Sequence, residues 1–496
     1  MASSIFSSNT SEQRWVDQLN QHFTIYVENP PSIFQVPKIV SDTNPEAYSP
    51  QKVGIGAFHH LRPDLEEMQS EKLEAVKGFL SPEQYQNFKS LIVDKVRALE
   101  PEIRSCYSKY LDLDCDTLAW IMSIDGIYLL HLLSKYPKQE NNIQPDDRDL
   151  TEDILMMENQ LPCIVLKEIN KSLNTPPNEG KKDEIEDGFE NMDEKLFAEM
   201  VSFCESHSPL DLVNSGQMSV FGGTKYLHIL DVMYNLMIYT MSSVEPVVFF
   251  SAEAGFPGGI KQVAQVAGDL TGLKPLLLLA NLPLEEFFGL LKKKDNANGI
   301  ENSSIQEINI PSASQLHRAL KIQFKKRAAG FSANAVKYEE QNRTLYLPVI
   351  RLNTDSEAIL RNLVAYELAS GSNNVISSYL DFMCGIIDTA EDVEFLKANG
   401  IIESPLPSEE IAKIFNGMNK SSGMEADFEG IVEKLNEDYE NTFRVKCWSF
   451  INDHLVPSEA TAKLILGILL ILLLTLQAFC QVYGCSARWF GKISSI

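Results

Sequence analysis

The sequence lacks the cysteine spacing of a zinc site or a disulfide framework. Its eight cysteines are spread through 496 residues, and no two of them form a C-x-x-C pair. A dispersed set of this kind is typical of a reducing compartment, where free thiols in apolar runs behave as small hydrophobic side chains. We therefore expect neither a metal site nor a cofactor.

Signatures of the common enzyme classes are also missing. The sequence contains no G-x-x-x-x-G-K-[ST], G-x-S-x-G or H-E-x-x-H pattern. The glycines of segments 54–57 (GIGA) and 255–261 (GFPGGIK) have spacings that fit neither a dinucleotide fingerprint nor a phosphate loop. The sequence therefore identifies no small-molecule substrate.

Positive charge is scarce. Lysine and arginine together number 43 against 68 acidic residues, which gives a net charge of −25 and a pI of about 4.8. Such a chain repels phosphate backbones, so nucleic acid is not an expected partner unless a local basic patch overrides this charge. Two local patches occur, at Lys292–Lys294 and at Arg318, Lys321, Lys325, Lys326 and Arg327. We interpret both as solvated helix faces.

The sequence does contain one long apolar run. Leu464 to Gly484 (LILGILLILLLTLQAFCQVYG) is 21 residues without a charge. As a helix rising 1.5 Å per residue, it would span a hydrocarbon core of ~30 Å. A buried core helix is the ordinary alternative, but such helices are usually shorter and less uniformly apolar. The run therefore predicts one transmembrane helix.

The surroundings of this run predict a tail-anchored protein. Only residues 485–496 follow it, and the N-terminal MASSIFSSNTSEQRWVDQLNQHF has neither the basic nor the apolar region of a signal peptide. We expect insertion after translation, with the bulk of the chain in the cytosol and either the plasma membrane or an endomembrane as the target. Five N-x-S/T sequons occur, at Asn9, Asn170, Asn302, Asn342 and Asn419. A cytosolic location predicts that none is glycosylated.

Helical periodicity dominates the rest of the chain. The predicted helices cover about 65–80, 81–99, 116–135, 151–169 with a break at Pro162, 310–326, 356–370, 390–399, 407–418 and 425–450. Segments 331–337 and 344–352 have strand character around a short QNR turn, which predicts a β-hairpin. The fold class is therefore mainly α: a large helical globular domain with a small β-hairpin, followed by one C-terminal transmembrane helix.

Composition shifts divide the chain into parts. We predict an N-terminal polar arm at 1–29, a helical domain at 30–455, the transmembrane helix at 464–484 and a short tail at 485–496. Within the helical domain, we expect an exposed acidic loop at about 173–194 and an insertion at about 244–304.

Several blocks in a fixed order carry a family likeness. They lie at 47–60 (AYSPQKVGIGAFHH), 121–133 (IMSIDGIYLLHLL), 153–166 (DILMMENQLPCIVL), 310–324 (IPSASQLHRALKIQF), 360–367 (LRNLVAYE) and 386–402 (IIDTAEDVEFLKANGII). With the C-terminal run, this pattern resembles the plant family called domain of unknown function 247, over roughly residues 30 to 485.

Two of these blocks depart from the family pattern. Members often have Gly-Pro-Phe-His-His-Gly where this chain has Gly56-Ala57-Phe58-His59-His60-Leu61, and Glu-Gln where it has Glu367-Leu368. The resemblance implies a plant-specific, mostly helical protein with a C-terminal anchor. Some relatives are associated with pollen–stigma self-recognition and with stress or defence responses, but the family supplies no catalytic residues.

Polar residues in apolar surroundings are the candidate site residues. Asp125 lies within the apolar helix predicted at 116–135, where a buried carboxylate needs a partner. We expect this partner to be Arg361 or a histidine of the loop that ends in Phe58-His59-His60, which we call the FHH loop. An Asp–His pair there is either a catalytic dyad or a structural hydrogen bond, and we favour the structural interpretation. His59 and His60 are neighbours whose side chains diverge in extended backbone, which disfavours a shared metal ion. The segment 158–162 (ENQLP) suits a helix break whose freed carbonyls need side-chain donors.

Two functional hypotheses remain. The first is a membrane-anchored component of protein interaction or signalling, whose acidic cytosolic domain meets protein partners. The alternative is a membrane-bound hydrolase or transferase that uses His59, His60 and Asp125. The missing catalytic motifs favour the first.

Overall fold

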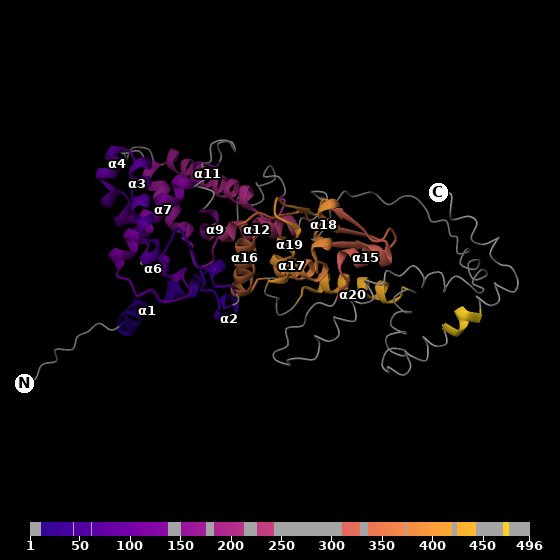
Figure 1. Ribbon diagram of the computed structural model, residues 1–496. Helices are drawn as coiled ribbons and strands as arrows, with labels where there is room; N and C mark the ends of the chain where they lie inside the picture. The colour runs from indigo at the N-terminus through magenta and orange to yellow at the C-terminus, as the bar shows by residue number, and fades with distance from the viewer. Residues whose placement is uncertain are drawn as a thin grey trace, which may run out of the picture. The chain divides into compact units, whose positions relative to one another are not determined.

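The computed structural model describes residues 11–136 (without 43 and 61), 150–174, 183–212, 226–242, 310–327, 336–418 (without 373), 424–442 and 470–475. These residues belong to one compact unit, which joins the part of the chain before residue 245 to the part after residue 306. Most of them are helical, which confirms the mainly α character of the predicted fold class (Figure 1).

The elements of the first part are short helices around one long one. They are α1 (Ser11–Glu28), α2 (Lys38–Ser41), η1 (Pro45–Tyr48), η2 (Pro63–Leu65), α3 (Glu67–Phe79), α4 (Pro82–Gln86), the π-type segment η3 (Lys89–Val93), α5 (Asp94–Ala98), α6 (Glu100–Ser105), α7 (Cys115–Leu133), α9 (Thr151–Ile154), α10 (Cys163–Asn174), α11 (Asp183–His207) and α12 (Ile229–Ser242).

The second part combines helices with short strands. They are α15 (Ala313–Leu320), β1 (Gln323–Lys326), β2 (Lys337–Glu339), β3 (Thr344–Leu347), β4 (Ile350–Arg351), α16 (Ser356–Ser370), α17 (Val375–Ile386), α18 (Ala390–Ala398), β5 (Ile402–Glu403), α19 (Ser408–Asn416) and α20 (Ala426–Glu440).

Helix α7 is the central element of the first part. The Asp114 carboxylate caps its N-terminus by accepting from the Thr117 N–H at 2.9 Å. The helix packs against α3, α5 and α10. Among the described helices it alone is long and apolar enough to cross a membrane, yet 67% of its most apolar window is buried inside the protein. Its apolar surface is therefore core, as the sequence predicts.

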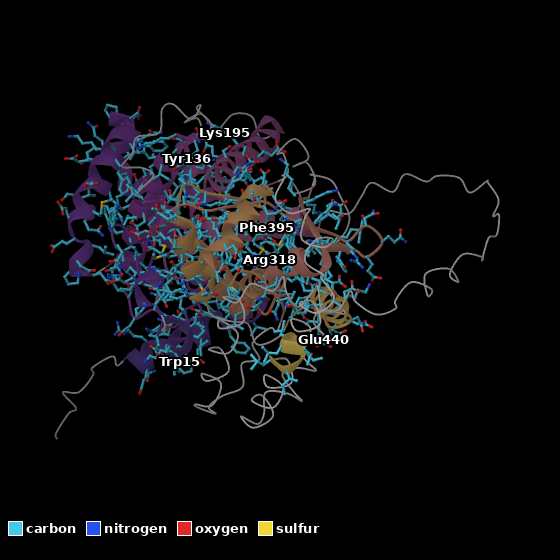
Figure 2. The ribbon with its side chains drawn as sticks, turned by 45° about the vertical axis from the view of Figure 1, so that its right-hand side comes forward. Trp15, Tyr136, Lys195, Arg318, Phe395 and Glu440 are labelled. Carbon is cyan, nitrogen blue, oxygen red and sulfur yellow. The ribbon has the colours of Figure 1, made fainter. Side chains whose placement is uncertain are left out.

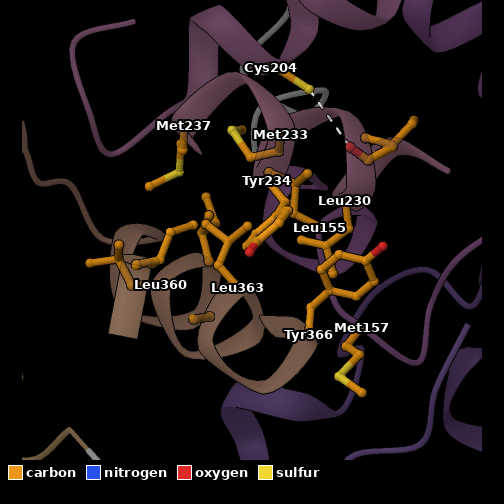
Figure 3. Packing of buried hydrophobic residues seen from close by; sticks show 14 of the residues in the cluster. Leu155, Met157, Cys204, Leu230, Met233, Tyr234, Met237, Leu360, Leu363 and Tyr366 are labelled. Atoms are coloured by element: carbon orange, nitrogen blue, oxygen red, sulfur yellow. Dashed lines mark hydrogen bonds between the residues drawn. The ribbon is translucent and has the colours of Figure 1, made fainter. Parts of the chain in front are cut away.

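Helices α12 and α16 face each other across a core of leucine, methionine and tyrosine (Figure 3). The rings of Tyr234 and Tyr366 meet edge to face at 5.4 Å between centroids. Met157, which follows α9, donates its N–H to the Asn362 Oδ1 of α16 at 2.9 Å. This bond and the shared apolar contacts join the two parts of the chain.

A β-hairpin around the QNR turn is confirmed, within a larger sheet than expected. Its first strand covers 337–339, not 331–337, and 331–335 lie outside the described residues. Strand β2 pairs antiparallel with β3, and β1 pairs parallel with the other side of β3. Residues 323–326 were predicted to continue a helix, and this was wrong. The helix ends at Leu320 because Lys321 takes the left-handed conformation with φ +60°, and an exposed–buried–exposed strand follows. Strand β4 lies within the predicted strand segment 344–352, whereas its parallel partner β5 had no sequence prediction as a strand.

Helices lie within two segments that were predicted as a polar arm and an exposed loop. The polar arm at 1–29 contains α1, which packs on α6 and carries an ion pair of 2.6 Å between Arg14 and Asp112. The stretch expected as an acidic loop at 173–194 ends in helix, since α11 begins at Asp183. The expected insertion at 244–304, the tail at 485–496 and all of the apolar run except 470–475 lie outside the described residues.

Candidate functional site

The FHH loop is held by polar side chains that lie far from it in sequence. The Asp153 carboxylate accepts from the backbone N–H groups of Gln51, Lys52 and Val53 at 2.9, 2.6 and 2.7 Å. Asn159 accepts from the Ile55 N–H at 2.6 Å and donates to the Val53 carbonyl at 2.8 Å. Buried backbone groups need such partners, so these bonds fix the path of residues 51–55.

Asp125 completes this arrangement from within α7. Its Oδ2 accepts from the Gly56 N–H at 2.9 Å, and its Oδ1 accepts from the Lys72 ammonium at 2.5 Å. Lys72 lies on α3, is fully buried and also donates to the Gly54 carbonyl. Burial raises the pKa of Asp125, whereas the Lys72 ammonium and the Gly56 N–H lower it. The partner of Asp125 is therefore Lys72, and the expectation of a histidine or Arg361 was wrong.

Arg361 serves a different junction. Its guanidinium contacts Glu357 one turn earlier in α16 at 2.8 Å and donates to the Gly417 carbonyl at 2.7 Å. It thus ties α16 to the end of α19. The sequence suggested it for Asp125 only because both residues lie in apolar runs.

The two histidines diverge, as predicted. His59 is 9% exposed, and its Nε2 lies 3.7 Å from Glu158 Oε2, too far for a hydrogen bond. Burial, assisted by the nearby Arg62, lowers the pKa of His59 to about 4. The imidazole is therefore neutral at pH 7, and its contact with Glu158 is not an ion pair there.

His60 turns to the other side of the loop. Its Nδ1 lies 2.9 Å from the Ala57 carbonyl, which can only accept, so the neutral ring carries its proton on Nδ1. His60 lines a cavity of about 460 Å³ between α3 and α7. The other lining residues are Gln69, Asp116, Thr117, Trp120, Ile121, Ile124 and Asp125. The cavity thus brings together two of the three candidate residues, His60 and Asp125.

The ENQLP segment acts as its helix break predicts. Gln160 Nε2 donates to the carbonyls of Ile154 and Met156, both at 2.7 Å, and its Oε1 accepts from the Leu230 N–H at 3.1 Å. The Gln160 carbonyl accepts from the Tyr107 hydroxyl at 3.2 Å. Side-chain donors therefore satisfy the carbonyls freed where α9 ends before α10.

Another buried carboxylate organises α17. Glu367 accepts from the Tyr234 hydroxyl at 3.1 Å and from the Ile376 and Ser377 N–H groups at 3.0 and 2.8 Å. It thereby caps the N-terminus of α17 with a negative charge from α16.

Lys72, Asp153 and Tyr107 are among the residues of these networks that had no sequence prediction. Lys72 had a usable signal, because Met68, Lys72 and Val76 share one helix face and both neighbours are apolar. Asp153 and Tyr107 had none, since their partners lie about 100 and 50 residues away along the chain. Among the described residues, no group of three or more His, Cys, Asp or Glu side chains could hold a metal ion.

Comparison of the sequence with known protein families identifies the family of this chain. The family model of domain of unknown function 247, described as "Plant protein of unknown function", matches residues 33–473. The chain belongs to this plant family. The FHH loop, the ENQLP segment and the LRNL block of this family member all lie in the networks described above.

Two curated proteins of Arabidopsis thaliana are similar to this family member. UPF0481 protein At3g02645 is 29% identical over 536 residues, which covers 98% of each chain. UPF0481 protein At3g47200 is 24% identical over 415 residues, which covers 80% of this chain and 74% of the relative. No solved structure matches the chain.

Proposed function

We propose that the protein is a single-pass membrane-anchored component of protein interaction or signalling, with its helical domain in the cytosol. The observation that carries the anchor is the exposure of five consecutive large apolar side chains. Leu470 to Leu474 are helical, and each is 56–62% exposed. They lie inside the uncharged run at 464–484.

Burial in a bilayer would stabilise these exposed apolar side chains. Full burial of a leucine or isoleucine is worth ~1.5–3 kcal/mol, so five half-exposed residues forgo several kcal/mol in water. A bilayer supplies that burial without a protein partner, because the helix satisfies its own backbone groups. The complete run of 21 residues has the length that a bilayer requires.

The interaction role is supported by what the candidate site residues do. Asp125, Asp153, Asn159 and Gln160 use their polar groups to hold backbone segments of the domain together. Residues engaged in this way position the fold, which leaves the exposed surface for recognition.

The cavity beside His60 supports the second candidate, an enzyme of the hydrolase or transferase type. It places an imidazole and a buried carboxylate next to the partly exposed Trp120. We rank it second because the carboxylate oxygens of Asp125 already accept from Lys72 and Gly56.

Membrane extraction of the full chain tests the anchor. We expect the wild-type protein to remain with membranes at alkaline pH, and Ile471→Lys/Leu473→Lys to be released, because lysine at the centre of a span is strongly unfavourable. Leu73→Lys, which changes a leucine of α3 that is 53% exposed, is the matched control and should remain membrane-bound. Release of the wild-type chain by alkali would refute the anchor.

A further inference from the structure

One stretch of this acidic chain carries only positive charge. Residues 308–338 contain no aspartate or glutamate. Their six basic residues are Arg318, Lys321, Lys325, Lys326, Arg327 and Lys337. The rest of the chain is therefore even more acidic than the net charge of −25 indicates.

The structure places these cations at the end of α15 and along β1, not on a single helix face. Lys321 occupies the left-handed residue that ends α15, and Lys325 and Lys326 are exposed on the edge strand β1. Arg343, exposed in the turn before β3, donates to the Leu320 carbonyl at 2.9 Å, which brings it to the same end. Lys325 and Lys326 are neighbours in extended backbone, so their side chains leave opposite faces of β1 at its exposed edge. We call this edge, with Lys321, Lys325, Lys326 and Arg343, the basic surface.

Neighbouring cations are neutralised, whereas those of the basic surface are not. Arg318, labelled in Figure 2, pairs with Glu391 of α18, and Lys337 pairs with Glu339 at 3.0 Å. In the part of the chain that the structure describes, no carboxylate lies within ion-pair distance of Lys321, Lys325 or Lys326. Edge lysines protect a strand from unwanted pairing, but that role does not require an acid-free stretch around them.

The basic surface is joined to the helix that leads toward the anchor. The Tyr338 hydroxyl of β2 donates to Asp438 of α20 at 2.7 Å, and Lys434 of α20 pairs with Glu340 at 2.9 Å. Leu464 follows Thr442 by 22 residue steps, which reach at most ~75 Å when fully extended. The anchor can therefore hold the basic surface close to the bilayer.

We propose that the basic surface binds the anionic phospholipid headgroups of the membrane in which the anchor sits. This inference rests on the proposed anchor. Lysine ammonium groups attract phosphate and carboxylate headgroups, and screening over about 8 Å at physiological salt weakens repulsion from distant acidic residues. The proposed anchor keeps the basic surface near the bilayer, so the effective concentration of lipid headgroups around it is far higher than that of a soluble acidic protein. This difference favours lipid as the ligand. The acidic remainder is repelled, so the contact orients the domain.

Lysine labelling of the reconstituted full chain tests this contact. The chain is placed in vesicles of phosphatidylcholine alone or with added phosphatidylserine, and treated with an amine-reactive reagent before mass spectrometry. We expect phosphatidylserine to lower the labelling of Lys321, Lys325 and Lys326 about fivefold each, and high salt to restore it. Lys195 of α11, labelled in Figure 2 and 77% exposed, is the control and should label equally in both vesicles.

Charge reversal provides a second readout, in the full chain whose anchor is disabled by Ile471→Lys/Leu473→Lys. This chain should float with phosphatidylserine vesicles at physiological salt, where screening limits repulsion from the acidic remainder, and addition of Lys321→Glu/Lys325→Glu/Lys326→Glu should abolish flotation. The control triple Lys77→Glu/Lys95→Glu/Lys195→Glu changes the charge equally at exposed lysines elsewhere and should still float.

The outcomes separate the two proposals. Equal labelling in both vesicle types, or protection by polyglutamate but not by phosphatidylserine, would overturn the lipid contact and leave the anchor intact. Loss of the wild-type chain from vesicles at alkaline pH would overturn the anchor, while the flotation experiment would still decide the lipid contact.

Discussion

Buried polar residues hold the first part of this protein together. Lys72 and Asp125 form an ion pair that the solvent does not reach, and both also bind the backbone of the FHH loop. Removing one member of such a pair leaves an uncompensated buried charge, which is far more costly than removing both. The pair therefore specifies where the loop sits on α3 and α7.

Replacement of Lys72 tests this assignment. We expect Lys72→Met to lower the free energy of unfolding by about 3–5 kcal/mol, because Asp125 remains buried without its cation. Lys72→Met/Asp125→Asn should recover a substantial part of that loss, as measured by urea denaturation. Lys77→Met, at an exposed lysine of the same helix, is the control and should change stability by less than about 0.5 kcal/mol. If Lys72→Met resembles the control, the pair does not hold the loop.

The neutral His59 makes stability depend on pH. Its pKa is about 4 in the folded chain and about 6.5 when unfolded, so the unfolded state binds more protons between these values. The contribution of His59 is fully present above pH ~6.5 and is lost as pH falls toward ~4. His59→Gln should therefore remove about 3 kcal/mol of pH dependence across this window, seen as the difference between the two unfolding curves. Parallel pH profiles for both proteins would contradict the buried neutral imidazole.

The sequence indicated which polar residues are important more reliably than it indicated their partners. The sequence nominated Asp125, His59 and His60 because polar groups in apolar runs need an explanation. It did not supply Lys72 as the partner, since a lysine on an amphipathic helix is ordinarily solvated. Pairing over 53 residues depends on how α3 packs on α7, which local pattern does not encode.

At the scale of helices and strands, the predicted boundaries were right where the residues at the helix ends carry a recognisable sequence signal. The helix starts predicted at 81 and 390 are confirmed by α4 and α18, where Ser81 and Thr389 form capping boxes whose side chains bond the first backbone N–H groups. The end of α15 was missed, since a lysine at φ +60° carries no sequence signal of the kind that glycine gives. The predicted helix therefore ran through β1.

Gly56 is the element-scale test of the FHH loop. It has φ +75°, and a Cβ there would lie 2.4 Å from the Gln160 carbonyl oxygen. Gly371 has φ +65° with nothing within 4 Å, so Gly371→Ala measures the backbone strain alone. We expect Gly56→Ala to lower the free energy of unfolding by at least about 2 kcal/mol more than Gly371→Ala does. Equal thermal destabilisation by the two substitutions would show that Gln160 does not confine the loop.

Over the whole molecule, segments of different charge are separated along the chain. The domain is strongly acidic, the stretch at 308–338 is basic, and the run at 464–484 has no charge at all. The sequence alone gives this distribution and the family. It does not indicate that the basic residues lie together around β1, because that depends on a left-handed turn and a parallel strand pairing.

Of the two sequons among the described residues, Asn342 is the better-placed reporter of topology. It lies exposed in the turn between β2 and β3, whereas Asn170 lies within α10. A glycosyltransferase on the same side of the membrane as the domain would therefore reach Asn342. We propose that the domain lies on the cytosolic side, where that enzyme is absent.

The most direct test of the membrane-anchored account is glycosylation mapping of the full chain with an added sequon after Ile496. We predict that endoglycosidase shifts the electrophoretic mobility of this chain, and that Asn342→Gln does not alter the shift, because only the added sequon crosses the membrane. A shift that depends on Asn342 would place the domain in the lumen. Absence of any shift would contradict insertion of residues 464–484.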